Sequence, residues 1–179
     1  MDFSTKYDSP VGTLTLACDG HNIVGLWLDG QKYHAATIKD GLEERDGLPV
    51  FVKARDWLDR YFAGEKPAID ELPLSPLGSA FRQRVWRILC EIPYGTCITY
   101  GDIAKKLAAE SSAARVSAQA VGGAVGHNPV SIIIPCHRVV GSTGSLTGYA
   151  GGIEKKIWLL THEGTNMTPL FKPTKGTAL

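Results

Sequence analysis

The chain has 179 residues, of which 44% are hydrophobic and 21% are charged, a composition typical of an ordinary soluble protein with one medium domain or two small ones. No apolar run approaches the roughly 20 residues that a membrane-spanning helix needs, and residues 1–6 lack the apolar stretch of a signal peptide. We therefore expect a cytoplasmic protein with no membrane partner.

Four cysteines stand far apart, with no CxxC pair and no Cys/His spacing typical of a metal site. They are Cys18, Cys90, Cys97 and Cys136. The simplest interpretation is four reduced thiols, with no metal and no cofactor.

The net charge of +1 conceals an uneven distribution. Residues 1–78 contain 8 Lys and Arg against 13 Asp and Glu, a net charge of −5, whereas residues 79–179 contain 11 against 5, a net charge of +6. A basic C-terminal part favours a polyanionic partner, but a solvated surface explains the same counts equally well.

The first part of the chain predicts a small sheet followed by one helix. Residues 13–17 alternate as a strand does, and residues 23–28 form a second strand that ends at an Asp-Gly turn. The charged stretch 40–47 is predicted to be a loop. In residues 50–62 apolar side chains recur at helical spacing, and Gly64 can end that helix in the left-handed conformation.

Residues 67–76 contain three prolines and are predicted to be a linker or an extended edge segment. We place a domain boundary near residue 75, which separates an N-terminal domain (1–75) from a C-terminal domain (76–179). Ser79 then caps a helix that runs to Cys90. Its predicted inward side chains are Phe81, Val85, Ile88 and Leu89, and its outward ones are Arg82, Arg84 and Arg87.

Two short capped helices follow. Thr99 caps the first, with Asp102 three residues later, and Ser117 caps the second, residues 118–125, after a polar break at 110–116. Two short helices joined in this way are typical of a helix-turn-helix. The second helix has almost no bulky side chains, which suits close approach to a ligand surface and, equally, close packing in a core.

The segment 131–139 carries the most reactive residues. Residues 132–134 are β-branched and predict a buried strand that ends at Pro135. Cys136 then lies beside His137 and the cation Arg138, and such neighbours promote the nucleophilic thiolate form. A Cys-His pair alone is more often an inert buried thiol beside a hydrogen-bonded histidine, so the surrounding sequence has to decide.

A loop of small residues, 141–152, contains Tyr149 and leads into a last helix, residues 153–163, which stops at Gly164. The predicted inward side chains of that helix are Ile153, Ile157 and Leu160. The tail after Asn166 shows little pattern.

The stretch Pro135-Cys136-His137-Arg138-Val139 resembles the active-site motif of the O6-alkylguanine-DNA alkyltransferases, or methylated-DNA–protein-cysteine methyltransferases. The similarity extends from Ser79 to Gly164. It includes Ile92-Pro-Tyr-Gly95, Tyr100, Val121-Gly-Gly-Ala124, Asn128-Pro129, Gly148-Tyr149 and His162-Glu163-Gly164. The resemblance implies an α/β N-terminal domain, a small sheet plus helix, followed by a mostly α, winged-helix-like domain with a helix-turn-helix.

The resemblance also implies roles for five catalytic residues. Cys136 matches the acceptor nucleophile, His137 the water-linked base, and Glu163 the carboxylate that orients the histidine. Asn128 matches the residue that braces the turn after the recognition helix. Tyr100 matches the tyrosine that rotates the target phosphate and protonates the leaving guanine.

Further residues are assigned to the base pocket and to DNA. Tyr149 matches a wall of the pocket, to which Val139 and Ala150 are also assigned. The predicted DNA contacts are Tyr100, Ala118, Gln119, Ala120, Gly122, Gly123 and Arg138. Gln119 departs from the family, in which an arginine fills the gap left by the flipped base; glutamine can hydrogen-bond the orphan base but brings no cation.

The implied function is direct-reversal DNA repair by a monomer that binds double-stranded DNA. An alkyl group on O6 of a guanine, flipped out of the duplex, is transferred to Cys136. The product is a thioether, which has no carbonyl for water to attack, so each molecule is expected to act once. Activity on O4-alkylthymine stays open.

Three alternatives remain. Relatives that only sense damaged DNA replace the cysteine, typically by tryptophan, and Cys136 argues against that function. A cysteine hydrolase using Cys136, His137 and Glu163 leaves the helix-turn-helix and the basic half unexplained. A winged-helix transcription factor makes Cys136 structural, and reaction with an alkylated oligonucleotide separates it from repair.

Overall fold

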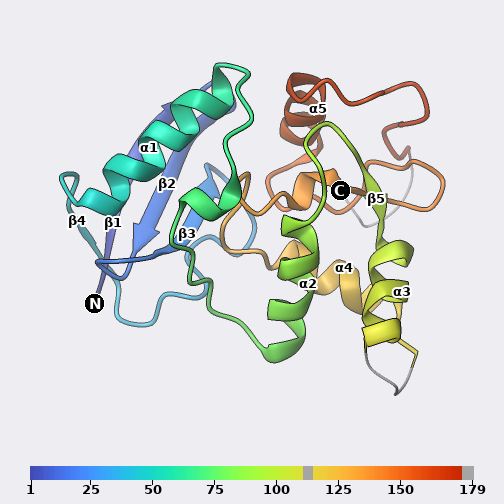
Figure 1. Ribbon diagram of the computed structural model, residues 1–179, viewed down its shortest axis with the longest axis horizontal. Helices are drawn as coiled ribbons and strands as arrows, with labels where there is room; N and C mark the ends of the chain where they lie inside the picture. Colours follow the sequence, from blue (N-terminus) through green and yellow to red (C-terminus); the bar gives the residue numbers. More distant parts are fainter. Residues whose placement is uncertain (111–114, 175–179) are drawn as a thin grey trace.

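The computed structural model describes residues 1–110 and 115–174. A four-stranded sheet with one helix forms the N-terminal part, and four helices (α2–α5) with long irregular connections form the C-terminal part (Figure 1). Within the described residues, no helix is both long and apolar enough to cross a lipid bilayer.

The sheet has the strand order β3-β2-β1-β4. Its strands are β1 (Asp2–Ser9), β2 (Gly12–Cys18), β3 (Ile23–Leu28) and β4 (Leu42–Glu44), antiparallel except for the parallel pair β1 and β4. The strands predicted at 13–17 and 23–28 are confirmed, and β1 was missed. The loop predicted at 40–47 is wrong in part, because backbone pairing with β1 makes β4 a strand without any apolar alternation.

Helix α1 (Pro49–Phe62) covers one face of the sheet, as predicted from its apolar spacing (Figure 1). Its buried side chains are Val50, Phe51, Ala54, Trp57, Leu58 and Tyr61. The helix is followed by Gly64, whose φ of 87° is the left-handed conformation predicted for it. On the opposite face, Trp27 packs with Ala35 and Ile38.

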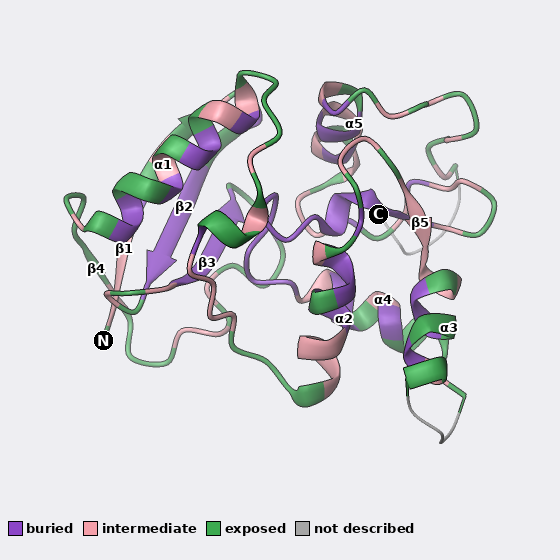
Figure 2. Ribbon diagram, viewed as in Figure 1, coloured by how far each residue is buried: buried purple, intermediate pink, exposed green. Residues whose placement is uncertain are grey.

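The outer edge of β3 joins the two halves of the chain. Near one end, Ile23 N donates to Pro73 O at 2.8 Å, so the proline-rich segment is partly the extended edge that was predicted; it also contains a short 3₁₀ turn, Ile69–Glu71. Farther along, Leu26 N donates to Pro129 O and Ser131 N donates to Leu26 O, both at 2.8 Å. One hydrophobic core runs from the sheet into the C-terminal helices (Figure 2).

The three predicted helix caps are confirmed in α2 (Ala80–Cys90), α3 (Tyr100–Glu110) and α4 (Ala118–Gly126). The cap bonds are Arg82 N to Ser79 Oγ at 3.4 Å, Asp102 N to Thr99 Oγ1 at 3.1 Å, and Ala120 N to Ser117 Oγ at 3.1 Å. Residues 111–114 of the predicted break lie outside the described residues. The helix-turn-helix and winged-helix character of this part stays a prediction.

Packing of α2 follows the prediction with two differences. Val85, Ile88 and Leu89 are buried, but Phe81 is only half-buried and Trp86 takes a place in the core. Trp86 Nε1 donates to Ala124 O of α4 at 2.9 Å, which satisfies the indole N–H and ties α2 to α4.

The strand predicted at 132–134 is wrong. These residues are buried, but they form turns: Ile133 N donates to Ser131 O, Ile134 N donates to Val130 O, and Ile132 has a φ of 69°. The next residues form a 3₁₀ turn, Cys136–Arg138, before β6 (Val139–Val140) pairs in parallel with β5 (Ile98–Thr99). A β-branched run signals burial as strongly as it signals a strand, which explains the error.

Helix α5 (Ile153–His162) is rotated relative to the prediction. Leu160 is buried as expected, but Ile153 and Ile157 are half-buried, and Leu159 and Lys156 face the core instead. A lysine can occupy an inward position here because backbone carbonyls accept hydrogen bonds from its ammonium group. The tail is held in part, since Ser145 pairs with Phe171; residues 175–179 lie outside the described residues.

Candidate active site

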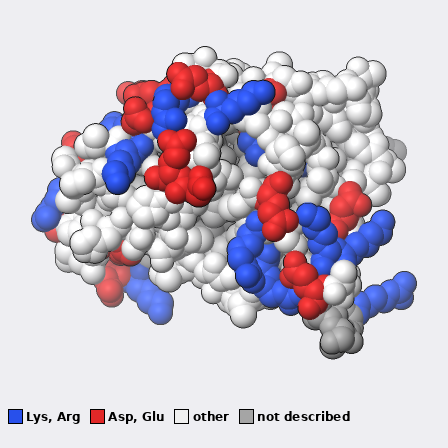
Figure 3. Space-filling view, in the orientation of Figure 1, with Lys and Arg blue, Asp and Glu red and all other residues white. Residues whose placement is uncertain are grey.

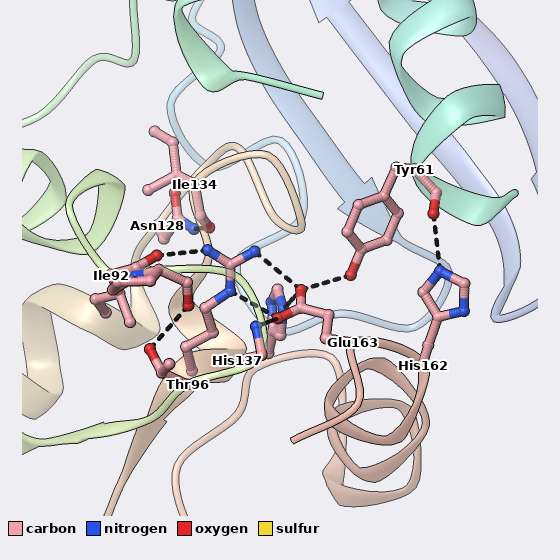
Figure 4. A network of polar contacts seen from close by, with 11 residues as sticks. Tyr61, Ile92, Thr96, Asn128, Ile134, His137, His162 and Glu163 are labelled. Atoms are coloured by element: carbon pink, nitrogen blue, oxygen red, sulfur yellow. Dashed lines mark hydrogen bonds and ion pairs between the residues drawn. The ribbon is translucent and has the colours of Figure 1, made fainter. Parts of the chain in front are cut away.

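The centre of the site is the carboxylate of Glu163, directly after α5, whose side chain is fully buried. Figure 4 shows the side chains that converge on it. Oε1 accepts hydrogen bonds from His137 Nε2 at 2.6 Å, Tyr61 Oη at 2.8 Å and Arg138 Nη2 at 3.0 Å. Oε2 accepts from Arg138 Nε at 2.8 Å and from Gly95 N at 3.2 Å.

These contacts decide the protonation of the His137–Glu163 pair. Burial alone would raise the pKa of Glu163, but the hydrogen bonds from His137 and Arg138 hold that pKa well below its usual range. Burial lowers the pKa of His137, so its imidazole is neutral at pH 7. Since Glu163 can only accept, Nε2 carries the single ring proton and Nδ1 keeps a free lone pair. Among the described residues, no protein atom hydrogen-bonds Nδ1.

The thiol of Cys136 lies next to this pair in the chain and is 5% exposed. Burial raises the pKa of Cys136, while the Asn128 side chain and the positive charge of Lys156 act in the opposite direction. At rest the site therefore holds a neutral thiol and a neutral imidazole. A thiol that acts as a nucleophile must lose its proton, and the unprotonated Nδ1 of the neighbouring residue His137 has the chemistry of a base.

Asn128 holds the turn that carries the thiol. Its Nδ2 donates to Ile134 O at 2.8 Å and to Val130 O at 3.4 Å, and its Oδ1 accepts from Val130 N at 3.0 Å. These bonds satisfy backbone groups of a buried segment that pairs with β3 only around Val130. They also help to hold Ile132 in its left-handed conformation, which for a β-branched residue costs about 1–3 kcal/mol.

Tyr100 begins α3 and reaches the loop 141–152. Its hydroxyl donates to Thr147 O at 3.0 Å, and a Cβ atom on Gly148 would lie 2.5 Å from that hydroxyl, so only glycine fits there. Burial, followed by the charge of Cys136, raises the pKa of Tyr100, which keeps the phenol protonated and able to donate.

The three residues assigned to the base pocket are brought together only in part. The ring of Tyr149 is buried edge-on to His137, with centroids 6.5 Å apart. Val139 is buried, and its carbonyl accepts from Lys156 Nζ at 2.5 Å. Ala150 is half-buried, and its carbonyl accepts from Lys32 N at 3.1 Å, so a loop of the N-terminal part holds this stretch of the 141–152 loop.

Helix α4 turns most of the predicted DNA contacts outward. Ala118, Gln119, Ala120 and Gly123 are exposed, whereas Val121, Ala124 and Val125 face the core. Gly122 is half-buried, and a Cβ atom there would lie 3.9 Å from the Tyr100 ring. The small residues thus leave an exposed backbone face directly beside Tyr100.

Arg138 was predicted to contact DNA, but the structure places its side chain inside the protein. Its side chain is 8% exposed and forms two hydrogen bonds with Glu163, while Nη1 donates to Ile92 O at 2.6 Å. Three of the five guanidinium N–H donors are used by these partners, and the burial of the side chain keeps it from the surface that a phosphate could reach. Its role is to neutralise the buried carboxylate.

Three contributors were missed from the sequence. Tyr61 comes from α1, Gly95 donates through its backbone, and Lys156 donates from α5 to Val139 O and to Thr147 O at 3.1 Å. Burial lowers the pKa of Lys156 to about 8. In the sequence, only Lys156 could have been recognised, because it shares one helix face with Leu159 and Leu160. The contacts of Tyr61 and Gly95 with Glu163 depend on tertiary structure and have no local signal.

The basic residues of the C-terminal part are visible on the face shown in Figure 3. Lys and Arg gather around α2 and α3, with acidic residues between them. Some are ion-paired: Arg84 with Glu110 at 3.3 Å, Lys106 with Glu91 at 3.2 Å, and Lys105 with Asp102 at 3.9 Å. These exposed pairs contribute little stability.

Comparison with protein families explains this arrangement. Residues 80–165 match the 6-O-methylguanine DNA methyltransferase DNA-binding domain, and residues 3–76 match the ribonuclease-like domain of the same enzymes. A methylated-DNA–protein-cysteine methyltransferase of Haemophilus influenzae is 44% identical over 161 residues, which are 90% of this chain and 86% of that protein. This chain belongs to the methylated-DNA–protein-cysteine methyltransferase family.

Other members of the methylated-DNA–protein-cysteine methyltransferase family are similar to this chain in sequence or in structure over most of its length. The protein of Methanosarcina acetivorans is 39% identical, over 89% of this chain and 96% of that one. The crystal structure of Mycobacterium tuberculosis OGT in complex with DNA has a TM-score of 0.79 and 42% identity, covering 90% and 92% of the two chains. An O6-methylguanine DNA methyltransferase of Methanococcus jannaschii has a TM-score of 0.62 and 32% identity, with 96% and 99% covered. The chain is thus a methyltransferase of DNA repair.

Proposed function

We propose that this protein repairs O6-alkylguanine in double-stranded DNA by a single, irreversible transfer of the alkyl group to Cys136. The observation that carries the proposal is the thiol beside a neutral imidazole whose other nitrogen is held by a buried carboxylate. This is the arrangement of nucleophile, base and orienting group that nucleophilic catalysis requires.

The reaction follows from the protonation states. The Cys136 sulfur attacks the alkyl carbon on O6 as its proton passes to His137 Nδ1, directly or through a water molecule, and the resulting imidazolium is stabilised by Glu163. The C–O6 bond breaks, and Tyr100 donates its phenolic proton to the leaving guanine. The neutral base departs and a thioether stays on the protein, while Tyr100 regains a proton and the imidazolium of His137 releases one through solvent.

Access to the target requires a flipped nucleotide, since the thiol is nearly buried and a base inside a duplex is unreachable. We propose that the exposed face of α4 enters a groove of the DNA and that Gln119 fills the space left by the base. Asn128 keeps the thiol-bearing turn in place, and Tyr149, Val139 and Ala150 line the pocket. We expect a monomer acting in the cytoplasm, without a cofactor.

Intact-mass analysis after incubation with an O6-methylguanine duplex tests the proposal. We expect a gain of about 14 Da on Cys136, one equivalent per protein, and no gain in Cys136→Ser, which still binds DNA. Repeated turnover, or methylation of another residue, would contradict the proposal. An O4-methylthymine duplex, run in parallel, decides whether that base is also a substrate, and hydrolysis of a simple ester would favour the cysteine hydrolase.

A further inference from the structure

Helix α1 supplies a hydrogen-bond donor to the catalytic carboxylate. The Tyr61 hydroxyl lies 2.8 Å from Glu163 Oε1, across 102 positions of sequence, and both side chains are buried (Figure 4). Among the described residues, the other donors to this carboxylate, His137, Arg138 and Gly95, all belong to the C-terminal part.

Tyr61 is itself held firmly. Its ring stacks on Trp57, with centroids 5.5 Å apart and planes 8° apart, and lies edge-on to Phe62 and Tyr94. Its carbonyl accepts from His162 Nε2 at 2.8 Å. Tyr61 therefore hydrogen-bonds two consecutive residues at the end of α5, His162 through its carbonyl and Glu163 through its hydroxyl. A donor with so little freedom fixes the orientation of the group it binds.

The hydroxyl also affects the basicity of the carboxylate. Three donors share Oε1, and the Tyr61 hydroxyl competes with His137 for that oxygen. Burial, then the charge and the hydrogen bond of Glu163, raise the pKa of Tyr61, so the phenol stays a neutral donor. A donor that stabilises the anion makes it a weaker base, so that Glu163 supports the imidazolium without removing its proton.

We infer that Tyr61 is a positioning residue for alkyl transfer, through which the N-terminal helix fixes the orientation and the basicity of Glu163. This inference rests on the proposed function and deepens it. It makes the N-terminal part a contributor to the chemistry.

The test compares two variants that each remove one hydroxyl from the same part of the protein. Tyr61→Phe removes the donor to Glu163 and keeps the ring. Tyr7→Phe is the matched control: the Tyr7 hydroxyl donates to Asp59 of α1 at 2.7 Å, and its ring stacks on Phe62, but it does not touch the site. Melting temperature and duplex binding are recorded for both variants.

We expect Tyr61→Phe to slow transfer from both the O6-methylguanine duplex and free O6-benzylguanine on the order of tenfold, as for other groups that orient a functional histidine. The acid limb of its pH–rate profile should move to higher pH, because a more basic Glu163 makes His137 hold its proton more strongly. Duplex binding should not change. Tyr7→Phe should match the wild type in rate and in profile.

A second measurement does not depend on alkyl transfer. The imidazole pKa of His137, followed by NMR in the free protein, should rise in Tyr61→Phe and stay unchanged in Tyr7→Phe. The other titratable and charged groups that face this pair are Arg138, Lys156, Cys136, Tyr149, Tyr94 and Cys97, and neither variant alters them.

Each outcome is decisive. The inference is overturned if Tyr61→Phe keeps both the wild-type rate of transfer and the wild-type pKa of His137. It is also overturned if transfer is slower while the pKa of His137 is unchanged, because Tyr61 would then be a packing residue. If the wild type takes up no alkyl group but the titration shifts as expected, the proposed function fails while the coupling of Tyr61 to the His137–Glu163 pair stands.

Discussion

At the scale of single residues, the site is built around a buried ionised carboxylate and its donors. Such a group is tolerated inside a protein only when it is paired and fully hydrogen-bonded, and Glu163 has both His137 and Arg138. The same residue therefore serves the proposed chemistry and the stability of the fold. Substitutions here should affect both properties.

We predict that Glu163→Gln slows alkyl transfer by roughly 10²–10⁴-fold, because a neutral amide stabilises the His137 imidazolium poorly. It should also lower the melting temperature, since Arg138 is left as an unpaired buried charge. DNA affinity, measured on folded protein well below the melting temperature, should change little. Equal losses in affinity and transfer would instead make the carboxylate purely structural.

Gln119 is exposed on α4, and a second prediction concerns its proposed place in the space left by the flipped base. Gln119→Arg should tighten duplex binding, because arginine adds a cation, while Gln119→Ala should cost on the order of 1 kcal/mol for a lost neutral hydrogen bond. Neither should affect reaction with free O6-benzylguanine, which needs no flipping. If Gln119→Ala slows both substrates equally, the residue supports the pocket and does not fill the stack.

At the scale of elements, short pairings place the reactive groups. The two-residue strands β5 and β6 bring the start of α3, with Tyr100, next to the segment that carries Cys136. The edge of β3 holds the turn at 129–131 by two backbone hydrogen bonds. The loop 141–152 passes close to Tyr100 at Gly148, where a Cβ atom would lie 2.5 Å from the Tyr100 hydroxyl.

We predict that Gly148→Ala slows transfer roughly 10–100-fold, from the duplex and from the free base alike, because the new Cβ atom displaces the Tyr100 hydroxyl. Gly152→Ala is the control: its φ of 95° is also left-handed, but a Cβ atom there has no neighbour within 4 Å. Both variants should lose some stability, and only Gly148→Ala should lose activity. Similar rates in the two variants would show that the approach to Tyr100 is unimportant.

At the scale of the whole molecule, the structure shows where the uneven charge of the sequence lies. Arg138 and Glu163 are buried and cancel each other, so apart from the buried Lys156 the +6 of residues 79–179 belongs to their surface or to residues outside the described ranges. On the face in Figure 3, basic side chains lie around α2 and α3. This charge favours contact with a polyanion.

We therefore predict salt-sensitive DNA binding that depends on the C-terminal part. The logarithm of the affinity should fall linearly with the logarithm of salt concentration, and each phosphate contact removed by a Lys or Arg substitution should reduce the slope by about 0.9. Arg138→Lys should leave this slope unchanged, because Arg138 faces Glu163. Binding that ignores salt, or that depends on substitutions in residues 1–75, would contradict this prediction.

Much of the architecture could be predicted because its signals are local. The caps at Ser79, Thr99 and Ser117 and the apolar spacing of α1 are properties of a few neighbouring residues. Cys136, His137 and Glu163 could be proposed from the family motif alone. The strand predicted at 132–134 failed because local preference cannot distinguish a buried strand from a buried turn.

The sequence by itself determined which residue types were available: a thiol beside an imidazole, a later carboxylate, three capped helices and a basic half. Tertiary structure alone decided which charges meet. It turned Arg138 away from solvent onto Glu163, placed Lys156 in the core, and brought Tyr61 from α1 to the same carboxylate. The physical reason is that a buried ion must find its partners in space, and the chain segments that supply them are distant in sequence.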